Sequence, residues 1–106
     1  MSSDTRGQLE LLLLRALQVG PAHGYAIIER IRSRSGGVFD LAEGSVYPAL
    51  HALEGAGLLK SRWAEERGRG RRTYELTAKG ERRLAQLTGD YRRFARGMVA
   101  VLEGTQ

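Results

Sequence analysis

Residues 44–59 read GSVYPALHALEGAGLL, and their pattern identifies the central helix of the chain. Val46, Leu50 and Leu53 are spaced four and three residues apart, which places them on one side of a helix. Pro48 is expected in the first turn, where its missing N–H costs little, and Gly57 is expected to cap the end. The stretch therefore predicts a short helix, starting near residues 44–45, that buries one side and leaves the other open to a partner.

Two further helices are predicted upstream. In residues 5–19, leucines spaced three and four apart form one apolar side, and Leu11 and Leu14 widen it to a second. A helix that is apolar on two sides is expected to contact both its own core and another subunit. Residues 23–34 show the same spacing, with Tyr25 expected among the buried side chains and His23 as a capping residue at the start.

A strongly basic hairpin is predicted after the third helix. Residues 58–66 and 71–76 read as strands, and residues 67–70 form a Gly/Arg tip between them. Residues 58–83 hold nine basic and four acidic side chains, which accounts for the whole net charge of +5. A local cluster of cations is typical of proteins that bind a polyanion. On the first strand, Trp63 is expected to pack against the last helix.

A long last helix is predicted to start at Thr77, which is expected to be its N-cap. Its apolar residues alternate at spacings of three and four, which is the heptad pattern of a helix that packs on a copy of itself. A homodimer is therefore expected, with Leu11 and Leu14 of the first helix in the same interface. The heptad residues are Leu84, Leu87, Tyr91, Phe94, Met98 and Val101.

Composition excludes several classes of protein. A length of 106 residues suggests one domain, and the absence of cysteine excludes disulfides, thiol catalysis and Cys-based zinc sites. No metal or cofactor is expected, and no apolar run approaches the ~18 residues of a membrane span. No secretion signal is recognisable, so a cytoplasmic location is expected. The candidate pair of nucleophile and base is Ser45 with His51. They are six residues apart on one helix and point in different directions, so no enzyme is expected.

Three helices, a basic hairpin and a long helix make a mainly α fold with a small β-hairpin: a winged helix-turn-helix plus a C-terminal dimerisation helix. Residues 1–76 are expected to form the DNA-binding domain, whose first helix also joins the dimer interface, and residues 77–106 the dimerisation helix. In this architecture the third helix enters a major groove of double-stranded DNA. The hairpin, or wing, places cations beside backbone phosphates.

Three segments carry a resemblance to a known family. They are LLLLRALQVGPAHGYAII at residues 11–28, GSVYPALHALEGAGLL at 44–59 and GRGRRTYELTAKG at 68–80. In this order they resemble the PadR family of bacterial transcriptional regulators over nearly the whole chain. The short C-terminal end suggests the form with a single C-terminal helix.

The resemblance implies a homodimer, joined through the first and last helices, that represses by binding an inverted repeat. It also implies that a ligand near the dimer interface releases the DNA. By position, the start of the recognition helix is matched by Ser45, Tyr47 and Pro48, with the Tyr47 hydroxyl on a phosphate. The wing cations are matched by Arg69, Arg71 and Arg72, and His51 joins the candidate contacts because it is expected on the exposed side of the same helix.

The chain departs from the family at two positions. Ala52 stands where an arginine is frequent, so direct base reading should be sparse and phosphate contacts should take a larger share. Tyr91 stands where some drug-binding relatives stack flat molecules on a tryptophan. A tyrosine can still stack a flat molecule, but it offers less area. Because aromatic surface is concentrated on the heptad seam, a small aromatic effector is expected at Tyr91 and Phe94, with the surroundings of Trp63 as a second place. The alternative from another class is a winged-helix interaction module whose basic wing binds an acidic protein.

Overall fold

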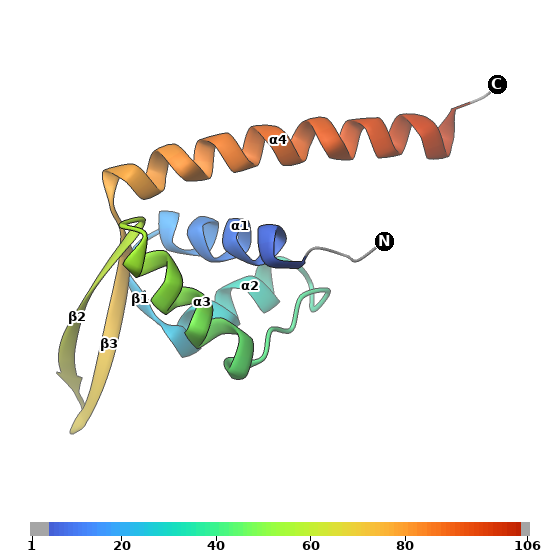
Figure 1. The fold of residues 1–106 in the computed structure, drawn as a ribbon. Helices are drawn as coiled ribbons and strands as arrows, with labels where there is room; N and C mark the ends of the chain where they lie inside the picture. The colour runs from blue at the N-terminus through green and yellow to red at the C-terminus, as the bar shows by residue number, and fades with distance from the viewer. Residues whose placement is uncertain (1–4, 105–106) are drawn as a thin grey trace.

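The computed structural model describes residues 5–104, and its elements follow the predicted order (Figure 1). Within these residues the chain forms four helices and a small antiparallel sheet, which confirms the winged helix-turn-helix fold. None of the helices in this range is long and apolar enough to cross a membrane. The elements are α1 (Thr5–Gln18), β1 (Ala22–His23), α2 (Gly24–Arg34), α3 (Glu43–Gly55), β2 (Leu59–Glu66), β3 (Arg69–Leu76) and α4 (Ala78–Glu103).

The hydrophobic core lies where α1, α2 and α3 pack against one another (Figure 1). The predicted inner side of α3 is confirmed, because Val46, Leu50 and Leu53 are all buried. Tyr74 of β3 joins them, and its burial raises the pKa of its hydroxyl above the ordinary value. The other buried core residues are Leu13, Leu14, Ala16, Leu17, Ala22, Ile27, Ile28, Ile31, Leu58, Leu59 and Leu84.

Side-chain caps fix the starts of α2 and α4, as the sequence predicts. The Nδ1 atom of His23 accepts a hydrogen bond from the backbone N–H of Ala26 at 3.3 Å. The Thr77 hydroxyl accepts from the N–H of Gly80 at 3.0 Å and donates to the carbonyl of Gly57 at 2.7 Å. The second bond of Thr77 ties the start of α4 to the segment that follows α3.

The sheet has the strand order β1-β3-β2. Strand β1 was not predicted, because two residues are too few to show an alternating pattern. The turn of the hairpin is also shorter than predicted. Glu66 pairs with Arg69, so only Arg67 and Gly68 form the turn, with φ angles of 54° and 78°. Positive φ at both central residues matches the twist of the flanking strands, which makes this a tight hairpin.

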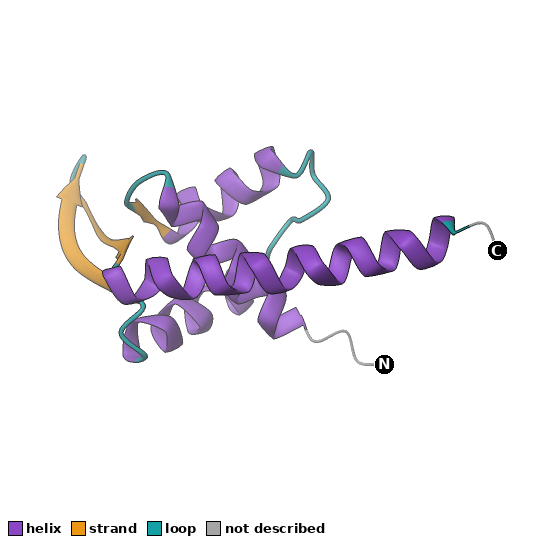
Figure 2. Ribbon diagram, turned by 90° about the horizontal axis from the view of Figure 1, so that it is seen from above, coloured by secondary structure: helices purple, strands orange, loops and turns teal. Residues whose placement is uncertain are grey.

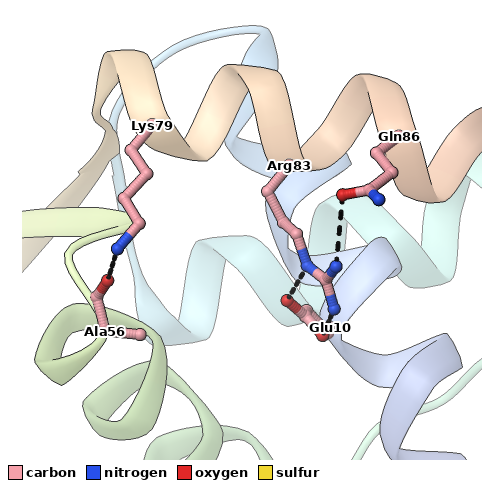
Figure 3. Close-up of polar contacts among 5 residues, drawn as sticks. All are labelled: Glu10, Ala56, Lys79, Arg83 and Gln86. Carbon is pink, nitrogen blue, oxygen red and sulfur yellow. Dashed lines mark hydrogen bonds and ion pairs between the residues drawn. The ribbon is translucent and has the colours of Figure 1, made fainter.

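Helix α4 leaves the body of the molecule partway along its length (Figures 1 and 2). Its first turns are held by two contacts, drawn in Figure 3. Lys79 donates to the carbonyl of Ala56 at 2.8 Å, and Arg83 Nε lies 2.9 Å from the Glu10 carboxylate in α1. The later turns expose a row of large apolar side chains: Tyr91, Phe94, Met98, Val99, Val101 and Leu102.

Candidate nucleic-acid interface

The solvent side of α3 presents the side chains that the sequence assigned to it. The helix reads EGSVYPALHALEG and contains no lysine or arginine, so it brings no positive charge to a polyanion. Its contacts with bases would therefore be neutral hydrogen bonds and apolar contacts. The exposed residues along the helix are Ser45, Tyr47, Pro48, His51 and Ala52, and Glu43, Gly44 and Gly55 are exposed at its two ends.

Pro48 lies deeper in α3 than predicted. The helix begins at Glu43 rather than near residues 44–45, so Pro48 falls beyond the first turn. A proline there has no N–H to donate to the carbonyl of Gly44. Gly44 is exposed, so water can reach its backbone.

Tyr47 is held against the start of α2. A Cβ atom built on Gly24 would lie 2.6 Å from the Tyr47 ring and 2.8 Å from its hydroxyl oxygen. Only glycine, which has no Cβ atom, leaves room for the ring, so Gly24 and Tyr47 together fix where the tyrosine side chain lies. The side chain keeps 38% of its surface exposed, which lets the ring pack while the polar end stays accessible.

On the wing, Arg71 reaches back to the start of α2. Its Nη1 atom lies 2.7 Å from Nε2 of His23 and 3.3 Å from Nδ1 of the same ring. The contact joins β3 to the residue that caps α2, and it leaves Arg71 half-buried. Arg69, two residues earlier on the strand, is exposed.

Arg72 belongs to a chain of contacts between the wing and α3. Its Nη1 atom donates to the Ser61 hydroxyl at 3.1 Å, and that hydroxyl donates to the Glu54 carboxylate at 2.7 Å. The guanidinium also lies over the Trp63 ring, 6.0 Å from its centroid, which is within the range of a cation–π contact. These contacts orient the wing relative to the recognition helix, a role for Arg72 that the sequence did not indicate.

Two aromatic residues lie elsewhere than expected. Tyr25, predicted to be buried, is 62% exposed, because the buried side of α2 is formed by Ile27, Ile28 and Ile31. Trp63, predicted to pack against the last helix, is 65% exposed. Its ring instead covers Gly70 across the hairpin, where any Cβ atom would collide with it. Both corrections add aromatic surface to the side of the molecule that carries the wing and α3.

These residues come together around one cavity of about 410 Å³. We call this cavity the wing cleft, since the wing, the start of α2 and the exposed side of α3 surround it. Of the predicted contact residues it includes Tyr47, His51 and the three wing arginines, whereas Ser45 and Pro48 are not among its lining residues. None of the described lining residues is acidic. The lining consists of His23, Gly24, Tyr25, Tyr47, His51, Trp63, Arg69, Gly70, Arg71, Arg72 and Tyr74.

The expected dimer residues fall into three groups. Leu14 and Leu84 are 0% and 2% exposed, so they belong to the core of the single chain and offer no surface to a second copy. This corrects their assignment to an interface. Leu11 and Leu87 are partly buried against the same core. The remaining residues are exposed on the outer turns of α4, namely Tyr91, Phe94, Met98 and Val101.

The candidate ligand residues are not joined in one cavity. Trp63 lines the wing cleft, whereas Tyr91 and Phe94 lie together on α4 with ring centroids 6.4 Å apart. A cavity of about 620 Å³ between α1 and α2 includes Leu12, Val19 and Ile31 in its lining, and none of the expected ligand residues. In the described part of the chain, no group of three or more His, Cys, Asp or Glu side chains could hold a metal ion.

Comparison with known proteins gives a consistent result. Residues 13–86 match the model of the transcriptional regulator PadR-like family. A transcriptional regulator of Mycobacterium tuberculosis is 35% identical over 92 residues, which cover 87% of this chain and 80% of the relative.

Solved structures show the same architecture. A protein of Streptococcus mutans superimposes with a TM-score of 0.83 at 30% identity, covering 98% of this chain and 95% of that one. Bacillus subtilis PadR, solved in complex with operator DNA, superimposes with a TM-score of 0.69 at 24% identity. The match covers 74% of this chain and 45% of that one, and at this identity it supports the fold alone.

Proposed function

The chain belongs to the PadR-like family of transcriptional regulators, which are not enzymes, and we propose that it represses transcription by binding an inverted-repeat operator as a homodimer. The observation that carries the proposal is the wing cleft, where three arginines and four aromatic side chains border the exposed side of α3. Cations beside a helix that fits the major groove are the arrangement by which winged helices bind duplex DNA.

The division of labour follows from the fold. Residues 1–76 supply the DNA-binding domain, with α3 in the major groove and the wing on the backbone. The neutral outer side of α3 leaves Ser45 and His51 as hydrogen-bonding groups for bases, and Tyr47 and Pro48 beside them. Arg69, Arg71 and Arg72 neutralise phosphates, so most of the affinity is independent of sequence and sensitive to salt. Bacillus subtilis PadR, which shares this fold, was solved in complex with operator DNA.

Residues 77–106 supply the dimerisation helix. Phe94 is 58% exposed and Val101 is 79% exposed, on a helix that extends away from the body (Figure 2). Such a row of apolar side chains is unfavourable in water unless a partner covers it. A second α4 at the same heptad spacing is the covering surface that we propose, with Leu11 and Leu87 at its edge. Twofold symmetry of the dimer then requires a palindromic operator.

We further propose that a small aromatic effector regulates the dimer. Tyr91 and Phe94 provide aromatic surface where two copies of α4 would meet, and Trp63 provides a second aromatic surface in the wing cleft. An effector at the α4 interface would not touch DNA. It would act by favouring a dimer with a different spacing between the recognition helices.

A selection experiment tests the proposal directly. A pool of random duplexes is selected on the purified protein, and the recovered sequence is then measured against excess bulk DNA by fluorescence anisotropy. The expected result is an inverted repeat whose half-sites lie about one helical turn apart and whose binding survives the competitor. A protein that selects no sequence, and loses all duplexes to bulk DNA, would instead fit a module that binds an acidic partner.

A further inference from the structure

The start of α2 and the wing meet at a polar contact that the proposed function does not by itself require. Arg71 is drawn back to His23 at 2.7 Å, although a wing cation would be expected to extend into solvent. The same imidazole caps α2 through Ala26. His23 therefore links the capping of a core helix to the position of a DNA-binding cation.

Both donors reach the same imidazole ring of His23. A guanidinium and a backbone N–H are both donors only, and a neutral imidazole has a single accepting nitrogen. Nε2 faces Arg71 at 2.7 Å, and Nδ1 faces the N–H of Ala26 at 3.3 Å. Arg71 Nη1 also lies 3.3 Å from Nδ1, so the tautomer that accepts at Nδ1 can serve both donors. The guanidinium carries five N–H groups, so Arg71 can keep its contact with His23 through Nη1 while its other N–H groups donate to an anion.

The wing cleft provides the other groups that such an anion needs. The cavity is bordered by Tyr25 and Tyr47, whose hydroxyls are neutral donors, and Tyr47 is fixed in place by its packing on Gly24. A volume of about 410 Å³ exceeds that of a phosphate group, so the adjoining sugars fit as well. Trp63 lines the same cavity and offers them an apolar face.

We infer that the wing cleft binds one phosphate of the DNA backbone through Arg71, Tyr25 and Tyr47, and that His23 is the residue that positions Arg71. The inference rests on the proposed function, because it assigns a specific group of the operator to a specific cavity. Tyr25 and His23 thereby become part of the DNA-binding surface. Arg71 is ordered before DNA arrives, so less side-chain entropy is lost on binding.

Trp63 makes the cleft directly observable. It is the single tryptophan of the chain, so its fluorescence reports on the cleft alone. The test titrates a short mixed-sequence duplex into the wild-type protein and into Arg71→Ala, Tyr25→Phe and Arg62→Ala, with the salt concentration varied. Arg62→Ala is the matched control, because Arg62 is an exposed wing cation that does not line the cleft.

We expect Arg71→Ala to weaken duplex binding roughly 10- to 100-fold, because a charge-assisted bond is lost, and to reduce the salt slope by about one. Tyr25→Phe should weaken binding roughly 2- to 10-fold, as for one neutral hydrogen bond. Arg62→Ala should have a clearly smaller effect than Arg71→Ala. Equal losses in the two arginine variants would mean that the wing acts through diffuse charge, which would overturn the inference.

His23→Asn tests the positioning role, because asparagine is a good N-cap but is too short to reach Arg71 as histidine does. Thermal unfolding should stay unchanged while duplex affinity falls roughly 2- to 10-fold, the cost of ordering one long side chain. The double variant with Arg71→Ala should bind no more weakly than Arg71→Ala alone. Additive losses would show that His23 acts through the fold and not through Arg71.

A titration with inorganic phosphate shows whether the cleft binds a phosphate of the DNA backbone or a free phosphate compound. We expect no change in Trp63 fluorescence at millimolar phosphate, since a lone ion lacks the adjoining sugars. A change at that concentration, absent in Arg71→Ala and not competed by duplex, would make the cleft a site for a free phosphate compound. If Arg71→Ala keeps the wild-type affinity and salt slope, the cleft is not a phosphate site, although the protein can still bind an operator. If the duplex selection recovers no sequence, the proposed function itself is rejected.

Discussion

Gly24 at the start of α2 and Tyr47 in α3 pack so closely that the tyrosine ring occupies the space of any Cβ atom at residue 24, 2.6 Å away. The pair joins the two helices of the helix-turn-helix at the point where they border the wing cleft. The position of Tyr47 therefore depends on a residue that makes no proposed contact with DNA.

Replacing Gly24 should accordingly affect both stability and DNA binding. Gly24→Ala forces the Tyr47 ring to move, which should destabilise the protein by about 1–3 kcal/mol, as overpacking does in other cores. Duplex affinity should fall as well, because the hydroxyl of Tyr47 is displaced. Thermal unfolding and fluorescence anisotropy measure the two effects.

The control is Gly55→Ala at the end of α3, where a Cβ atom meets nothing within 4 Å. It should be neutral or stabilising by up to about 1 kcal/mol, since alanine is the better helix former. If both variants behave alike, the close approach of Gly24 and Tyr47 does not determine stability.

The dimer should depend on the outer turns of α4. Phe94→Glu places a charge on the proposed seam without burying it in the monomer, because Phe94 is 58% exposed in the single chain. The charge would be buried without a partner in the dimer, at a cost of several kcal/mol. Light scattering after size exclusion should show a dimer for the wild type and a monomer for the variant, with the same helix content by circular dichroism.

Arg92→Glu is the control, since it makes a charge change on the same helix but outside the heptad seam. It should remain dimeric. A wild-type monomer at micromolar concentration would contradict the proposed dimer outright. A dimer that survives Phe94→Glu would place the interface on another surface.

The sequence predicted the helices and strands better than it predicted which of their side chains are buried. Leu84 and Phe94 follow one heptad pattern, yet Leu84 is covered by the chain's own core and Phe94 is exposed, because periodicity does not show where the body of the molecule ends. Tyr25 has apolar neighbours in sequence, but it lies off the side formed by the isoleucines of α2.

The candidate site, too, was predicted only in part from the sequence. The wing arginines were predicted from their charge and from the family resemblance, and the structure brings them to one cavity with Tyr47 and His51. The contact of Arg71 with His23 joins residues 48 positions apart, so it has no local signal. The two-residue strand β1, which sets His23 beside β3, is equally invisible in the sequence.

The chain of contacts from Glu54 through Ser61 to Arg72 should stabilise the wing. Ser61→Ala removes the hydroxyl that bridges the carboxylate and the guanidinium, at a cost of about 1 kcal/mol. Hydrogen exchange of the β2 and β3 amides should become faster, while α1 exchanges as before. In the double variant Ser61→Ala, Arg72→Ala the losses should be less than additive. Unchanged exchange in the wing would mean that the bridge does not order it.

The proposed effector should bind on the outer turns of α4. Two surfaces compete for it: the aromatic pair Tyr91 and Phe94 on α4, and the cavity of about 620 Å³ between α1 and α2. Tyr91→Ala should abolish the response of operator affinity to aromatic compounds, because the ring that such a compound would stack on is removed. Val19→Trp, which fills the α1–α2 cavity from its exposed rim, should leave the response intact. Operator affinity is measured with and without each compound, and coupling of about 1–3 kcal/mol would appear as a 5- to 150-fold change. The reverse pattern, a response lost in Val19→Trp and kept in Tyr91→Ala with the dimer intact, would move the effector to the α1–α2 cavity.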